Sequence, residues 1–152
     1  MNKIGKYKII VDKQLIIIYF SGNIDVDDLI NLQKNLHSNP AFDASFDVIA
    51  DFRDCLTIVS QDDIARYVQF MKDNISYYQK RKGAYLTCKP NQVVATTLFS
   101  IKLSELPIEI KIFSSIGSIV HWLYARQIDF QFIENTLSQL GTQPNIVFEK
   151  LK

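Results

Sequence analysis

Cysteine and glycine are both scarce in this sequence of 152 residues, and their scarcity excludes several kinds of site. The two cysteines, Cys55 and Cys88, have no Cys-x-x-Cys spacing, so they form neither a zinc-binding pattern nor a disulfide framework. Two isolated thiols are typical of a reduced, cytoplasmic protein. The five glycines form no Gly-x-Gly-x-x-Gly or Gly-Lys-Ser/Thr loop, so a Rossmann or Walker-type nucleotide site has no support.

An excess of charge of one sign is also missing. Lysine and arginine number 17 against 16 aspartates and glutamates, which removes the basic character expected of a nucleic-acid-binding protein. The run Lys80-Arg81-Lys82 is the one candidate basic patch, and with Tyr77 and Tyr78 it would offer a surface for single-stranded nucleic acid. The alternative is the end of an amphipathic helix, with packed rings and hydroxyls in water. We expect no nucleic-acid partner.

Long apolar runs are absent as well. The longest, Leu15 to Phe20, is far shorter than the roughly 20 residues that cross a bilayer. The first 13 residues alternate charged and apolar side chains and lack the apolar region of a signal peptide. With 47% hydrophobic and 22% charged residues, the chain has the composition of one globular domain. We expect a cytoplasmic protein without stable membrane insertion.

The side-chain pattern predicts alternating strands and helices. Strands are predicted over residues 7–11, 15–20, 46–52, 83–88 and 108–113, and the first two form an antiparallel hairpin. Helices are predicted to begin at Asp25, Ser60, Pro90, Ser115 and Asp129. The basic run at 80–82 is placed just past the second helix, Gly141 stops the last one, and residues 145–151 form a short strand or an ordered tail. Such alternation predicts right-handed crossovers and a mostly parallel sheet.

The order of these elements resembles the sulfate-transporter and anti-sigma-factor-antagonist (STAS) superfamily, in its stand-alone bacterial branch. The hairpin followed by Gly22-Asn23-Ile24-Asp25 is similar to the start of that domain, and the segment from Asp47 to Arg53 resembles its strand that ends in an acidic residue. Phe113 and the following helix, which ends in Trp122-Leu123, are similar to its final segment. The resemblance spans roughly residues 5 to 124.

The resemblance implies an α/β fold: a STAS-like βα superhelix with a mostly parallel sheet opened by an antiparallel hairpin, and helices mainly on one face. Residues 1–127 would form this domain, and residues 128–152 a C-terminal helical extension packed on the domain or on a second subunit. The resemblance also implies non-enzymatic roles, namely binding of a partner protein, a nucleotide or an apolar ligand.

Ser60 is the candidate phosphorylation site that the resemblance implies. The best-known relatives carry a phosphorylated Ser or Thr in an Asp-Ser-Ser-Gly-like motif where the acidic strand meets the next helix. Here no Ser or Thr directly follows Asp51, no Gly follows Ser60, and Asp62 and Asp63 would repel an added phosphate. The structural alternative for Ser60 is a plain helix N-cap.

Asp51, Arg53 and Asp54 cluster at the carboxyl end of a central strand, where open parallel sheets usually bind ligands. With Ser60 they form the candidate binding site. The alternative is a local ion pair that contributes about 0–1 kcal/mol. Neither His37 nor His121 has a further ligand at metal-binding spacing, so no metal and no cofactor are expected.

The helix from Pro90 to Glu105 is apolar around more than half of its circumference, so the C-terminal extension, a second subunit or an apolar ligand should cover it. The leading hypothesis is a non-enzymatic regulatory or ligand-binding module, a homodimer that binds a protein partner or a small apolar molecule. The alternatives are a small enzyme that uses Cys55 or the carboxylates of Asp51 and Asp54, and a purely structural dimerisation domain.

Overall fold

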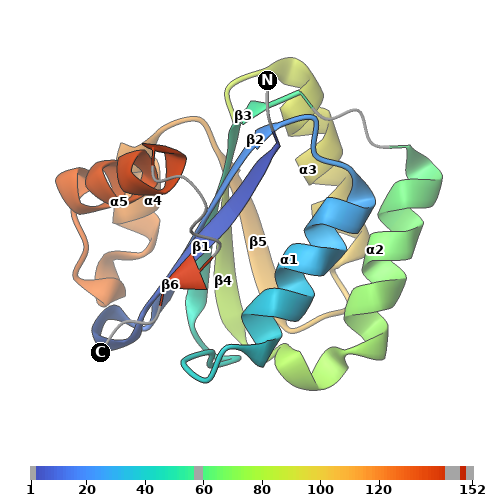
Figure 1. Cartoon of the computed structure of the whole chain (residues 1–152), viewed down its shortest axis with the longest axis horizontal. Helices are drawn as coiled ribbons and strands as arrows, with labels where there is room; N and C mark the ends of the chain where they lie inside the picture. Colours follow the sequence, from blue (N-terminus) through green and yellow to red (C-terminus); the bar gives the residue numbers. More distant parts are fainter. Residues whose placement is uncertain (1–2, 57–59, 143–147, 150–152) are drawn as a thin grey trace.

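A computed structural model describes residues 3–56, 60–142 and 148–149 of the chain. Within these ranges, six strands form one sheet in the order β5-β4-β3-β2-β1-β6, and five α-helices cover its two faces (Figure 1). The strands are β1 (Ile4–Ile10), β2 (Leu15–Gly22), β3 (Asp47–Cys55), β4 (Arg81–Leu86), β5 (Ile108–Phe113) and β6 (Phe148–Glu149). The helices are α1 (Val26–Ser38), α2 (Gln61–Asp73), α3 (Pro90–Lys102), α4 (Ile116–Trp122) and α5 (Phe130–Thr142).

The sheet is opened by an antiparallel hairpin and is otherwise parallel. β1 pairs antiparallel with β2, and the pairs β2–β3, β3–β4, β4–β5 and β1–β6 are parallel. Helices α1, α2 and α3 lie on one face, and α4 and α5 lie on the other (Figure 1). The predicted hairpin and the predicted mostly parallel sheet are therefore confirmed. The predicted strand or tail at 145–151 is seen only as β6, and its other residues lie outside the described ranges.

Strand β2 is buried on both faces, which explains its unbroken apolar run. Ile16, Ile18 and Phe20 enter the core beneath α1, α2 and α3. Leu15 and Ile17, which point the opposite way because strand side chains alternate, enter the core beneath α4 and α5. The sheet thus separates two hydrophobic cores. Among the described helices, none is both long and apolar enough to cross a membrane.

Helix α3 buries a different face from the one its apolar residues suggest. Gln92, Thr96 and Phe99 are its buried residues, while Val94 and Ile101 are each 60% exposed. Its last helical residue is Lys102, not Glu105. Because α5 lies on the opposite face of the sheet, the hypothesis that the C-terminal extension covers α3 is wrong (Figure 1).

Helix α5 instead covers β1 and β2. Ile133, Leu137 and Leu140 enter the second core. Gly141 lies inside the helix and does not end it, because α5 continues to Thr142. A Cβ atom at Gly141 would stand 3.4 Å from the ring of Tyr19, an ordinary van der Waals distance, so this ring packs directly against α5.

Strand β4 begins two residues earlier than predicted, at Arg81, because the parallel ladder with β5 starts at the pair Arg81–Ile108. The basic run was predicted just past the end of a helix, but Arg81 and Lys82 belong to strand β4. Arg81 is buried, at 8% exposure, while the ammonium group of Lys82 lies 5.1 Å from the ring centre of Trp122. Tyr78 is buried as well. The prediction that its hydroxyl lies in water is therefore wrong.

Candidate functional site

The predicted charged cluster forms a local ion pair. Arg53 donates from Nε and Nη2 to the two carboxylate oxygens of Asp51, each at 3.0 Å, and its backbone N–H donates to Asp51 as well. This fork geometry is the strong form of an arginine–carboxylate contact. It raises the pKa of Arg53, with burial acting in the opposite direction. Asp51 is only 1% exposed, and both oxygens of its carboxylate already accept hydrogen bonds from Arg53.

Asp54 has a different partner, the hydroxyl of Tyr19, which donates to its carboxylate at 2.6 Å. Burial, followed by this hydrogen bond, raises the pKa of Tyr19 to about 12. Tyr19 packs on the core beneath α4 and α5, and the charge of Glu134 on α5 acts on Arg53. The Asp51–Arg53 pair and Asp54 therefore belong to the α5 side of the sheet.

Ser60 belongs to the other side, at the start of α2. Its hydroxyl accepts a hydrogen bond from the backbone N–H of Asp63 at 3.1 Å, and the Asp63 carboxylate accepts one from the Ser60 N–H at 3.3 Å. These two bonds form a complete capping box, so the predicted N-cap is confirmed. The predicted grouping of Ser60 with Asp51, Arg53 and Asp54 in one binding site stays a prediction, and the contacts of each residue are satisfied locally.

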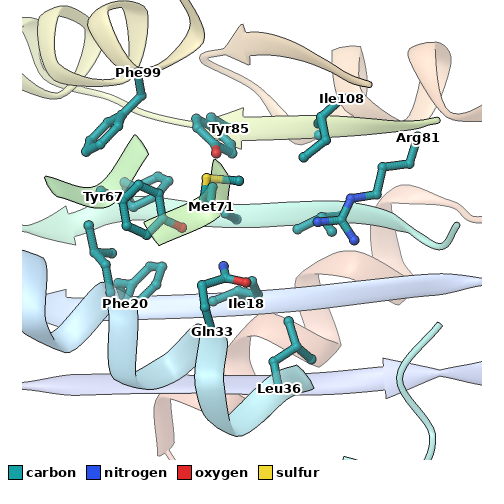
Figure 2. Close-up of a pocket in the computed structure, with 15 residues that line it drawn as sticks. Ile18, Phe20, Gln33, Leu36, Tyr67, Met71, Arg81, Tyr85, Phe99 and Ile108 are labelled. Atoms are coloured by element: carbon teal, nitrogen blue, oxygen red, sulfur yellow. The ribbon is translucent and has the colours of Figure 1, made fainter. Parts of the chain in front are cut away.

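The structure brings together a set of residues that the sequence pattern did not join. A cavity lies between the sheet and helices α1, α2 and α3, with about 50 Å³ open to the centre of a water-sized sphere (Figure 2). About 10–15 Å³ of such space holds one water molecule. The walls are mostly apolar and come from four strands and three helices: Ile18, Phe20, Leu29, Leu36, Val48, Ala50, Phe52, Met71, Phe99 and Ile108, with Gln33, Tyr67, Arg81, Gly83 and Tyr85.

The polar ends of Gln33, Tyr67, Tyr85 and Arg81 point into this cavity (Figure 2). Nε and Nη1 of Arg81 and Oε1 of Gln33 are buried and have no hydrogen-bond partner in the part of the chain that the structure describes. Buried polar atoms are normally hydrogen-bonded, and leaving one unpaired costs about 1–3 kcal/mol. Unpaired polar atoms on an apolar wall are therefore the feature expected of a ligand-binding cavity.

Two more unpaired groups lie near Arg81. Within the described ranges, the Tyr78 hydroxyl and Nε2 of His37 are buried without a hydrogen-bond partner. The guanidinium of Arg81 lies 5.3 Å from the ring centre of Tyr78, and the His37 and Tyr78 rings are 5.5 Å apart. Burial, followed by the charge of Arg81, lowers the pKa of His37 to about 4. His37 is thus neutral at pH 7.

A second hollow of about 30 Å³ continues the cavity toward the carboxyl end of β3. It shares Leu29, Phe52 and Phe99 with the first and reaches Cys55 and Gln92. The two hollows therefore lie next to each other along β3 and share apolar walls.

Gln92 lines the second hollow near the end of β3. Its amide Nε2 donates to the backbone oxygens of Arg53 and Cys55 at 3.1 and 3.0 Å, and its Oε1 accepts from the Cys88 N–H at 2.9 Å. The first helical turn of α3 is thereby fastened to the end of β3. Within the described parts of the chain, no group of three or more His, Cys, Asp or Glu side chains is arranged to hold a metal ion.

One sequence signal could have revealed part of this cavity. Gln33 lies on the same helical face as Leu29 and Leu36, four residues after one and three before the other, so it is a polar residue on a buried stripe. Arg81 gave no such signal. Its two lysine neighbours made it look like part of a solvated run, and only the register with β5 places it inside.

Comparisons with known proteins support the fold. No protein-family model and no curated protein matches the sequence. The structure matches the crystal structure of an uncharacterized protein of the DUF3478 family with a SpoIIAA-like fold, from Shewanella loihica PV-4, with a TM-score of 0.50. The two proteins are 14% identical, and the match covers 72% of this chain and 83% of that one. The chain therefore has a SpoIIAA-like, STAS-type fold, as the resemblance implied.

The cap at Ser60 makes a stability prediction. Replacing Ser60 with Ala should lower the free energy of unfolding by about 1 kcal/mol, because the Asp63 N–H loses its acceptor. Replacing Ser60 with Asp should leave it nearly unchanged, because aspartate is an equally good cap. Urea denaturation of both variants measures this. Equal midpoints for wild type and Ser60→Ala would show that the hydroxyl contributes nothing as a cap.

The low pKa of His37 makes a pH prediction. The pKa of His37 is about 4 in the folded state and 6.5 as its ordinary value, so the unfolded chain binds the proton more tightly. Stability should therefore be complete above pH 6.5 and fall as the pH drops toward 4. Because part of the ring meets solvent, we expect a loss of about 1–2 kcal/mol. Urea denaturation across this pH range should show a smaller loss of the free energy of unfolding for His37→Gln than for wild type. His121→Gln is the control, because His121 is exposed, and it should follow wild type. The same pH dependence of stability in all three proteins would refute the prediction.

Proposed function

We propose that this protein is a non-enzymatic binding module that takes a small, mainly apolar molecule into the cavity between its sheet and helices α1, α2 and α3. The observation that carries this proposal is the set of unpaired buried polar atoms, from Gln33 and Arg81, on the apolar wall of that cavity. A well-packed core would hold neither an empty space nor unpaired donors, since both cost stability.

The position of the cavity suits a sensor. It is walled by α1, α2 and α3 together, so a bound molecule would contact all three helices. The exposed outer surfaces of the same helices are available to a protein partner. A ligand that binds one arrangement of these helices more tightly than another would shift the population toward it. The STAS-type fold supports a regulatory role of this kind.

The residues proposed for the alternative enzyme have other tasks. Asp51 is held by Arg53, Asp54 accepts from Tyr19, and Cys55 is buried, with 3% of the residue exposed. Catalysis by acid and base groups needs their side chains to reach one reacting atom. These contacts favour binding over catalysis as the role of the chain.

Filling the cavity tests the proposal with a neutral probe, 1-hexanol. We expect 1-hexanol to shift the methyl NMR signals of Ile18, Val48 and Ile108, and to bind Ala50→Leu about tenfold more weakly, because the larger side chain occupies the space. Ala65→Leu is the matched control, since Ala65 is exposed on α2. An unshifted spectrum, or equal affinity for wild type and a folded Ala50→Leu protein, would refute the proposal.

A second proposal concerns assembly: a homodimer formed through the outer surface of α3. Val93, Val94 and Ile101 of this helix are 43%, 60% and 60% exposed. An open groove of about 510 Å³ extends from Ile101 toward α2. Ile64 and Leu98 contribute to its apolar lining, and Asp62 and Lys102 contribute charged side chains. Exposed apolar residues that gather in this way are typical of a contact surface.

Native mass spectrometry of the protein as purified tests the dimer. We expect a dimer for wild type and a monomer for Ile101→Lys, because a charge would be buried without a partner. Val11→Lys is the control, because Val11 is similarly exposed, at 41%, but lies in the hairpin loop. A monomeric wild-type protein at micromolar concentration would contradict the dimer. Any additional retained mass would identify the natural ligand directly.

A further inference from the structure

Arg81 is the residue that reveals which molecule fits the cavity. Among the described residues, it is the one cationic side chain on the cavity wall. It is 92% buried, and its guanidinium points into the space between α1 and the sheet (Figure 2). Two of its nitrogens, Nε and Nη1, have no hydrogen-bond partner within the described ranges. Because a guanidinium stays protonated at any ordinary pH, the cavity contains a fixed positive charge.

No acidic side chain in the described parts of the chain forms an ion pair with this charge. Asp47, whose charge acts on Arg81, already has other hydrogen-bond partners. Its carboxylate accepts hydrogen bonds from Nε of Arg126 and from the backbone N–H of Lys82, both at 2.7 Å. What lies against Arg81 instead is the ring of Tyr78. A buried cation that lacks an anionic partner is strongly unfavourable unless something else supplies the negative charge.

Neutral hydrogen-bond donors stand beside the charge. Burial raises the pKa of Tyr85 to about 12 and that of Tyr67 well above its usual range, so both hydroxyls keep their protons. Both point into the cavity, as does the amide of Gln33, which forms a side-chain hydrogen bond with Tyr67 (Figure 2). One cation and several neutral donors match a single negative charge. The rest of the wall is apolar and extends along β3 toward Phe52 and Phe99.

The route to this end of the cavity is also basic. Arg81 and Ile108 line both the cavity and a large open groove outside it, of about 890 Å³. Lys80, Lys82 and Arg126 line the same groove with two acidic residues, Asp47 and Glu109, so its lining keeps an excess of positive charge. A groove of this charge raises the local concentration of anions. Arg81 therefore stands where an anion arriving from the surface would first meet the apolar interior.

We propose that the ligand is a small amphipathic monocarboxylate, held with its carboxylate against Arg81 and its apolar body along β3. This inference rests on the proposed function, because it names the chemical class of the molecule that the cavity takes. A phosphate ester with two charges would leave one of them unbalanced beside a single arginine. The narrow hollows suit a short aliphatic or aromatic acid.

The test compares two probes of equal length, hexanoate and 1-hexanol, by titration followed by NMR at pH 7. We expect wild-type protein to bind hexanoate at least about tenfold more tightly than 1-hexanol, because a charge-assisted hydrogen bond forms only with the acid. Arg81→Met should lose this preference and still bind 1-hexanol. Arg66→Met is the control, since Arg66 is paired with Asp27 on the surface, and it should keep the preference.

The outcomes separate the two proposals. Binding of 1-hexanol with equal or weaker binding of hexanoate in wild type would overturn the carboxylate and leave the apolar cavity intact. Hexanoate binding that is unchanged in Arg81→Met would do the same. Failure of 1-hexanol to bind the wild-type protein would refute the proposed function itself, as in the first test. The wild-type comparison needs no variant, so it decides the matter even if Arg81→Met does not fold.

Discussion

Burial of the central strands on both faces is the constraint on which the rest of this structure depends. β2, β3 and β4 are parallel neighbours, and their alternating side chains feed two separate cores. Both faces of such a sheet must be covered, because either one left open would expose a continuous apolar surface. Three helices cover one face and two cover the other (Figure 1). The C-terminal helix α5 is therefore part of the second core.

The two faces differ in how well they are filled, and the candidate site follows from that difference. The face beneath α1, α2 and α3 contains long polar side chains, Gln33, Tyr67 and Arg81, where a fully packed core would have aliphatic ones. These side chains border an incompletely filled space and leave donors unpaired. Stability is lost at that point, and residues that reduce stability in this way are common at functional sites. A ligand with an apolar body and one charge would restore both the packing and the pairing.

The polar residues singled out in the sequence already have hydrogen-bond partners within the protein. Asp51 and Arg53 form a two-point ion pair, and Ser60 completes a capping box. Both arrangements are local, with partners two or three residues apart, so a sequence pattern can anticipate them. The burial of Arg81 is not a local feature. The ring of Tyr78, three residues away, lies against it, but its place inside the sheet depends on β5, which begins at Ile108.

The sequence by itself determined the order of strands and helices, the opening hairpin, and the caps at Asp25, Ser60 and Ser115. These depend on local periodicity and on hydrogen bonds between near neighbours. Only the tertiary structure decided which face of α3 is buried, which side of the sheet α5 covers, and that Arg81 faces a cavity. The physical reason is that burial is a property of the surroundings. A side chain becomes part of a site only when segments distant in sequence close around it.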